Sequence, residues 1–145
     1  MTRSEIDEVL KDTLPEADLP YDMPRPEDWR RLEAKFAMTF PESFVSFVEL
    51  LTKYEFPGDV YNVCSSGRTN GNDSIDVAFD VECGNPDWPR SLVPFCGVGN
   101  GDYFALDAKA GAESPVLYWY HERNAAEVYA PSFEEWLRGL PAFLG

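Results

Sequence analysis

The segment after Gly58 constrains the fold most, because its apolar residues recur with the two-residue period of a β-strand. Short runs rich in β-branched and aromatic residues alternate with turn-forming residues, and the links are too short for the helical crossovers that parallel strands need. The pattern therefore predicts an antiparallel sheet of five to six strands. The predicted strands are DVYNV (59–63), SIDVAFDV (74–81), LVPFC (92–96), DYFALD (102–107) and PVLYWYH (115–121).

Helical spacing dominates the segments on either side of these strands. Apolar residues recur every three to four positions in PEDWRRLEAKF (26–36) and again in FPESFVSFVELLTKY (40–54). Near the C-terminal end, Ser132 and Glu135 have the spacing of a capping box before another apolar stripe. The chain is therefore predicted to form a single α+β domain, with the antiparallel sheet packed against helices at its N- and C-terminal ends.

Residues 1–26 are expected to differ from the domain proper, which we place at residues 27–145. A short helix is predicted from Ser4 to Thr13, with Ser4 as its N-cap. The proline-rich stretch LPEADLPYDMPRP follows it, and its fixed φ angles and missing N–H donors favour an extended arm draped over the domain.

Net charge limits the kinds of partner. The chain has 26 acidic and 12 basic residues, which gives a formal charge of −14. Such a surface repels nucleic acid and anionic membranes, because both are bound mainly through Lys and Arg. It attracts basic proteins, so a basic protein partner is predicted. Acidity that serves only solubility explains the composition equally well.

The three cysteines, Cys64, Cys83 and Cys96, indicate neither a disulfide framework nor a zinc site, because they are odd in number and show no Cys-x-x-Cys spacing. The N-terminal stretch MTRSEIDEVLKD lacks the apolar core of a signal peptide, and no run approaches the ~18 apolar residues of a membrane span. We expect a cytoplasmic protein without cofactor or metal. Exposed strand edges leave homodimerisation open.

The glycine-rich stretch GVGNGD (97–102) is not expected to bind phosphate, because a strand follows it where phosphate loops lead into a helix. Asn100-Gly101 instead predicts a hairpin, with Asp102 accepting local backbone hydrogen bonds. Cys96, His121 and Asp102 are the side chains that a catalytic triad would use. The local signatures of cysteine enzymes are absent, so no catalytic residue is predicted.

Acidic side chains concentrate between Tyr54 and Asp87, where seven acids face a single basic residue, Arg68. The predicted strand 74–81 would carry one acidic and one apolar face, with aromatic residues nearby. Aromatic anchors surrounded by charge are typical of protein-binding surfaces, although a merely solvated sheet face would look similar. The candidate partner-binding residues are Glu55, Asp59, Tyr61, Asp73, Asp76, Asp80, Glu82, Asp87 and Trp88.

Five segments, taken in order, resemble the SUKH superfamily (Smi/Knr-like), which includes a fungal cell-wall regulator and many bacterial immunity proteins. These segments are WRRLEAKF, TFPESFVSFVELL, LVPFCGVGNGDYFALD, SPVLYWYHERN and APSFEEWLRGL, between about Trp29 and Leu137. The resemblance implies the SUKH fold and no enzymatic activity. It also implies a bacterial immunity protein that binds and neutralises a cognate toxin, often a nuclease. The alternative that it implies is a Knr-like regulatory scaffold that binds signalling proteins.

Overall fold

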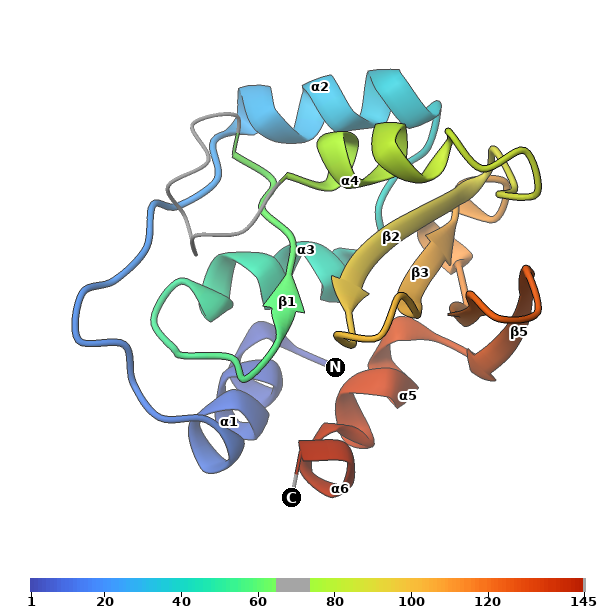
Figure 1. Ribbon diagram of the computed structural model, residues 1–145. Coiled ribbons are helices and arrows are strands. Elements are labelled where there is room, and N and C mark those ends of the chain that lie inside the picture. Colours follow the sequence, from blue (N-terminus) through green and yellow to red (C-terminus); the bar gives the residue numbers. More distant parts are fainter. Residues whose placement is uncertain (65–73, 145) are drawn as a thin grey trace.

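The computed structural model describes residues 1–64 and 74–144, which form six α-helices, a 3₁₀ turn and a five-stranded antiparallel sheet (Figure 1). The predicted single-domain α+β fold is confirmed. The elements are α1 (Arg3–Thr13), α2 (Pro26–Phe36), α3 (Glu42–Leu51), β1 (Asp59–Val60), α4 (Ile75–Glu82), β2 (Leu92–Gly97), β3 (Tyr103–Asp107), η1 (Gly111–Glu113), β4 (Val116–Tyr120), β5 (Ala125–Ala130), α5 (Phe133–Arg138) and α6 (Leu140–Leu144).

The sheet is a meander in which each strand pairs with its neighbour in sequence, in the order β1-β2-β3-β4-β5. The predicted strands at 92–96, 102–107 and 115–121 are confirmed as β2, β3 and β4. The predicted strand 59–63 is reduced to the two residues of β1, and β5 was not predicted. GVGNGD forms the turn of the β2–β3 hairpin, as its Asn-Gly pair indicates, with Gly99 and Gly101 at positive φ.

The prediction of a strand over 74–81 is wrong, because Ile75–Glu82 forms helix α4. Asp76 and Asp80 fit the alternation of polar and apolar residues expected of a strand. They are also four residues apart and therefore share one helix face. That face lies against α2, where Asp76 pairs with Arg31 (2.6 Å) and Asp80 with Lys35 (2.9 Å). Tertiary ion pairing and the burial of Ile75 on another face of the helix favour the helix over the strand.

The main core lies between the helices and one face of the sheet. Its aromatic rings meet edge to face, with Phe44 5.5 Å from Phe95 and Phe95 5.1 Å from Trp136, measured between ring centroids. Helix α1 belongs to the same core, since Ile6 and Leu10 are fully buried. Thr2 rather than Ser4 caps this helix. A smaller cluster covers the other face of the sheet and consists of Trp88, Leu92, Ala105 and Trp119.

The N-terminal arm is held in place by main-chain hydrogen bonds to the end of α3 and the loop after it. The amides of Ala17 and Tyr21 donate to the carbonyls of Lys53 and Thr52, at 2.9 Å each. The amide of Glu55 donates back to Pro15 (3.0 Å). The arm therefore follows a defined path past the C-terminal end of α3, visible at the left of Figure 1.

The ion pair between α2 and α4 is expected to contribute measurably to stability. Arg31 also donates to the carbonyl of Val63 (2.9 Å), so Arg31→Ala removes two partly buried hydrogen bonds of a charged group. We expect the free energy of unfolding in urea to fall by about 1–3 kcal/mol. Arg30→Ala, one position earlier and 69% exposed, should change it by less than about 0.5 kcal/mol. Equal effects of the two substitutions would contradict this role of Arg31.

Candidate functional site

The structure does not gather all the sequence-predicted binding residues on one face. Glu55, Asp59 and Asp87 are exposed, whereas Trp88 is buried with 2% of its surface accessible. Asp73 lies outside the described residues. The remaining four residues are Tyr61, which follows β1, and Asp76, Asp80 and Glu82 on α4.

Asp76 and Asp80 contribute less negative charge to the surface than the sequence suggests. Their carboxylates are bound by Arg31 and Lys35 of α2, as described above. Burial acts to raise the pKa of Asp76, but hydrogen bonds and the Arg31 charge outweigh it, so the pKa lies below its ordinary value. These two acids therefore hold α4 in place and offer little free charge to a partner.

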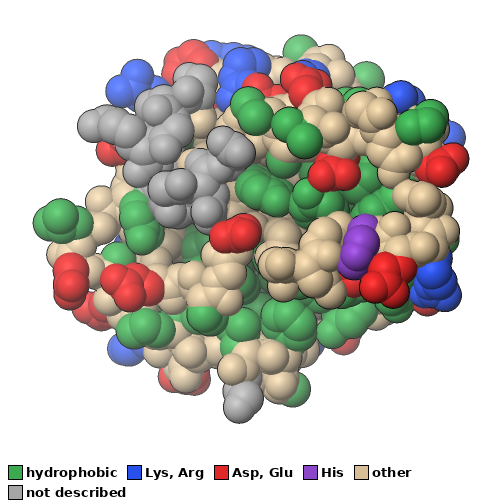
Figure 2. All heavy atoms as spheres, in the orientation of Figure 1, with side chains coloured by type: hydrophobic (Ala, Val, Ile, Leu, Met, Phe, Trp, Pro, Cys, Tyr) green, Lys and Arg blue, Asp and Glu red, His purple; other side chains and the backbone are tan. Residues whose placement is uncertain are grey.

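Three of the predicted residues do lie together: Asp59, Tyr61 and Glu82. Tyr103, which was not predicted, lies beside them, and we call these four residues the Tyr61–Tyr103 face. The two tyrosine ring centroids are 6.2 Å apart. The Tyr103 hydroxyl donates to a Glu82 carboxylate oxygen at 2.6 Å, which joins β3 to the end of α4. In Figure 2, apolar side chains with a few acidic ones among them line this side of the molecule between α4 and the β2–β3 hairpin.

Gly97 allows the Tyr61 side chain to lie flat against the sheet. A Cβ atom at position 97 would be 2.9 Å from the Tyr61 hydroxyl oxygen, closer than real Cβ contacts come. Burial raises the pKa of Tyr61 to about 12. Burial and the hydrogen bond to Glu82 also raise the pKa of Tyr103 above its ordinary value. Both hydroxyls therefore remain protonated near neutral pH, and the Tyr103 hydroxyl proton is used in the hydrogen bond to Glu82.

Trp88 is buried beneath this face. Its indole N–H donates to the carbonyl of Leu92 at 3.1 Å, and its ring lies 4.8 Å from that of Trp119. The Tyr103 ring meets Trp88 edge to face at 5.7 Å. Tyr103 is not among the candidates predicted from the sequence. The available signal was an aromatic side chain at the position of β3 that faces away from the main core.

The side chains of a possible Cys–His pair are not arranged for nucleophilic catalysis. Cys96 is 2% exposed, and burial followed by the nearby Asp59 charge raises its pKa to about 12, so the reactive thiolate is not populated near neutral pH. The ring Nδ1 of His121 lies 2.6 Å from a carboxylate oxygen of Asp102. Among the described residues, no three His, Cys, Asp or Glu side chains converge as metal ligands.

Asp102 connects two turns of the sheet, so the expected local hydrogen bonding of its carboxylate is wrong. One carboxylate oxygen accepts from the backbone N–H of His121 (2.8 Å) and the other from the Tyr118 hydroxyl (2.8 Å). Gly101, at φ +96°, makes room for the imidazole, since a Cβ there would lie 3.0 Å from His121 Cγ. These contacts clamp the β2–β3 turn to the end of β4.

The clamp predicts a dependence of stability on acid pH. Burial acts to raise the pKa of Asp102, but the hydrogen bonds from His121 and Tyr118 outweigh it, so the pKa lies below the ordinary 3.8. The ionised carboxylate therefore stabilises the fold above the unfolded pKa, and this contribution disappears as the pH falls through the folded pKa. Asp102→Asn should cost about 1–3 kcal/mol in urea unfolding at neutral pH.

The difference between the wild-type protein and Asp102→Asn should shrink at pH values below about 4. Asp87→Asn, at an exposed position, serves as the control and should leave the free energy of unfolding unchanged at both neutral and acid pH. A loss of stability in Asp102→Asn that is the same at acid and neutral pH would show that the carboxylate charge is not responsible.

The fold and the site define a class of small α+β domain. It has an aromatic and acidic face, and its Gly101, Asp102 and His121 serve the structure of the sheet. The sequence matches the family model SUKH_5, described as SMI1-KNR4 cell-wall, over residues 4–140. The chain therefore belongs to the SMI1-KNR4 (SUKH) family, as the resemblance predicts. The match also includes α1 and the arm, which lie before the segments that carry the resemblance.

The fold recurs in a solved structure. The crystal structure of a protein from Pseudomonas syringae pv. tomato superposes with a TM-score of 0.65 at 16% sequence identity, covering 93% of this chain and 95% of that chain. At this identity the likeness shows the fold alone. Comparison with curated proteins finds no significant match. No helix among the described residues is long and apolar enough to cross a membrane.

Proposed function

We propose that the chain is a bacterial immunity protein that neutralises a cognate toxin by binding it directly in the cytoplasm. Membership in the SUKH family, over nearly the whole chain, carries this proposal. The net charge of −14 supports a basic toxin, such as a nuclease, because nuclease clefts that bind polyanions are positively charged.

The Tyr61–Tyr103 face is the surface proposed to contact the toxin. Tyrosines at the centre of an interface supply large contact area and hydrogen bonds at low entropic cost, and they are enriched among binding hot spots. Asp59 is exposed beside the rings, and Glu82 holds the Tyr103 hydroxyl. These carboxylates complement Lys and Arg side chains of a basic partner, and they would set the speed and specificity of association.

Co-expression tests the function. The protein should rescue cells from the toxin encoded by the neighbouring gene and from no unrelated toxin, and the two purified proteins should form a stable complex. Absence of both protection and binding would refute the immunity function. Recovery of several unrelated signalling proteins in a pull-down would instead support the scaffold alternative, which the cell-wall description of the family suggests.

Truncation of Tyr103 tests the location of the binding surface. Tyr103→Ala should weaken the complex about 30-fold or more, the loss expected for a hot-spot residue worth ~2 kcal/mol, as measured by calorimetry. Tyr129→Ala is the matched control, because Tyr129 is 52% exposed and its ring packs on the opposite face of the sheet. Full affinity in Tyr103→Ala, with loss in Tyr129→Ala, would place the interface elsewhere without refuting the immunity function.

Electrostatic steering of the association is tested separately, by salt and by neutralising single carboxylates. The association rate should fall as salt is raised, because salt screens attraction between exposed charges over distances beyond about 8–10 Å. Asp59→Asn should reduce the rate, whereas Asp18→Asn on the exposed N-terminal arm should have a smaller effect. A rate that does not respond to salt would contradict electrostatic steering, and stopped-flow fluorescence measures it directly.

A further inference from the structure

A small cavity lies beside the Tyr61–Tyr103 face, where the loop before β1 meets the β2–β3 hairpin. Its volume is about 170 Å³, roughly the space that six water molecules occupy in the liquid. Pockets for drug-sized ligands are larger, at about 300–1,000 Å³. The cavity therefore has the size of one long side chain of a binding partner.

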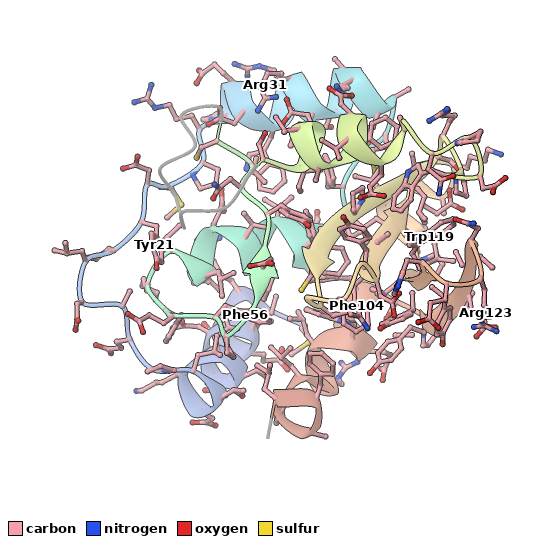
Figure 3. All side chains as sticks on the ribbon, in the orientation of Figure 1. Tyr21, Arg31, Phe56, Phe104, Trp119 and Arg123 are labelled. Carbon is pink, nitrogen blue, oxygen red and sulfur yellow. The ribbon has the colours of Figure 1, made fainter. Side chains whose placement is uncertain are left out.

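Apolar groups form most of the cavity wall. Two phenyl rings line it, Phe56 from the loop before β1 and Phe143 from α6. Phe56 is half-buried, and Figure 3 labels it below β1; Phe143 is 46% exposed. Val98 and the backbone of Gly97 and Gly99 form another part of the wall. A Cβ atom added at Gly99 would have no heavy atom within 4 Å beyond its chain neighbours, so the space beside the turn is open.

Asp59 is the only charged residue among the described residues that line the cavity. It is exposed and lies opposite Gly97 in the pairing of β1 with β2. Its charge acts on the Tyr61 hydroxyl and on the Cys96 thiol, so its carboxylate is close to both groups. No described residue forms an ion pair with this carboxylate or donates a hydrogen bond to it. The cavity therefore combines apolar walls with one uncompensated negative charge.

This combination determines which side chain fits. An apolar side chain would remove water from the Asp59 carboxylate without replacing its hydrogen bonds, which is costly, and an acidic one would be repelled. A long basic side chain meets both requirements, because its aliphatic stem can lie against apolar walls while its charged end reaches the carboxylate.

Arginine fits this cavity better than lysine. Its planar guanidinium stacks on aromatic rings and binds a carboxylate through two hydrogen bonds. It is also more weakly hydrated than the lysine ammonium, so it loses less on entering a partly apolar cavity. Phe56 and Phe143 supply the rings, and Asp59 supplies the carboxylate.

We propose that this cavity is a subsite for one arginine side chain of the protein partner, with the guanidinium paired to Asp59 and the stem covered by Phe56 and Phe143. Only the identity of that partner rests on the proposed function. The cavity adjoins the Tyr61–Tyr103 face, because Asp59 belongs to both and the Tyr61 hydroxyl lies against Gly97 in the cavity wall. One partner can therefore contact the face and fill the cavity together.

An arginine analogue tests the subsite without a toxin. Nα-acetyl-arginine methylamide should shift the amide NMR signals of Gly97, Val98 and Gly99 saturably, with a dissociation constant of about 1–10 mM, as expected for one side chain. The matching citrulline compound is neutral with nearly the same shape, and the norleucine compound has an apolar stem alone. Both should bind at least about ten-fold more weakly, because neither pairs with the carboxylate.

Two variants locate the bound analogue. Asp59→Asn removes the charge but keeps the shape, and it should weaken binding at least about ten-fold. Its control is Asp18→Asn, at an exposed position on the N-terminal arm. Phe143→Ala should weaken binding about three-fold through loss of a stacking ring. Tyr129→Ala is its matched control, since Tyr129 is 52% exposed and packs on Phe104 as Phe143 does, but does not line the cavity.

Three results of the titration would overturn the subsite. They are the absence of a saturable shift up to about 50 mM arginine analogue, equal binding of a neutral analogue, and unchanged binding in Asp59→Asn. Shifts of the same amide signals when the protein alone is concentrated would show that a second copy fills the cavity, and they would also overturn it.

Dissociation kinetics test the subsite in the complex with the toxin encoded by the neighbouring gene. Asp59→Asn should raise the dissociation rate at least about ten-fold, because loss of a desolvated charge pair acts on dissociation, whereas loss of a rim charge acts mainly on association. Asp18→Asn should leave the dissociation rate unchanged. An unchanged rate in Asp59→Asn would overturn the subsite and leave the immunity function standing. Binding of the arginine analogue without binding of the toxin would support the subsite and count against the immunity function.

Discussion

The Asp102 carboxylate is the contact on which both surfaces of the sheet depend. It receives hydrogen bonds from Tyr118 and His121, and it is 8% exposed, so its charge is held within the fold by these donors. The clamp fixes the start of β3. The next two residues, Tyr103 and Phe104, then point to opposite faces of the sheet, as successive strand residues must. Tyr103 joins the Tyr61–Tyr103 face, and Phe104 supports the rings beside β5.

Strands β2, β3 and β4 could be predicted because their alternating apolar residues leave one face for the main core. β5 could not be predicted, since Ala125, Ala126 and Glu127 have low strand propensity and most of the strand is exposed. Helix α4 was mistaken for a strand because Asp76 and Asp80 are four residues apart. That spacing places two residues on the same face of a strand and also on the same face of a helix. The choice between the two depends on Arg31 and Lys35, which lie about 45 residues earlier in the sequence.

The sequence also provided an incomplete picture of the candidate site, because it does not show which side chains are buried or paired. Counting acids gave Asp59 and Glu82, which lie near Tyr61, the same weight as Asp76 and Asp80, whose charges α2 compensates. Aromatic type alone cannot distinguish Trp88, which supports the face from within, from Tyr103, which is partly exposed. Burial and ion pairing are properties of the tertiary fold, so the sequence could indicate the region and not the face.

Tyr61 and Tyr103 meet at one surface although they pack against different parts of the fold. Tyr103 packs with Trp88 in the smaller cluster, whereas Tyr61 packs against the main core. The Asp59 and Glu82 carboxylates act on the Tyr61 hydroxyl, and exposed carboxylates beside aromatic rings favour a basic partner. The proposed binding surface therefore depends on the packing of both clusters.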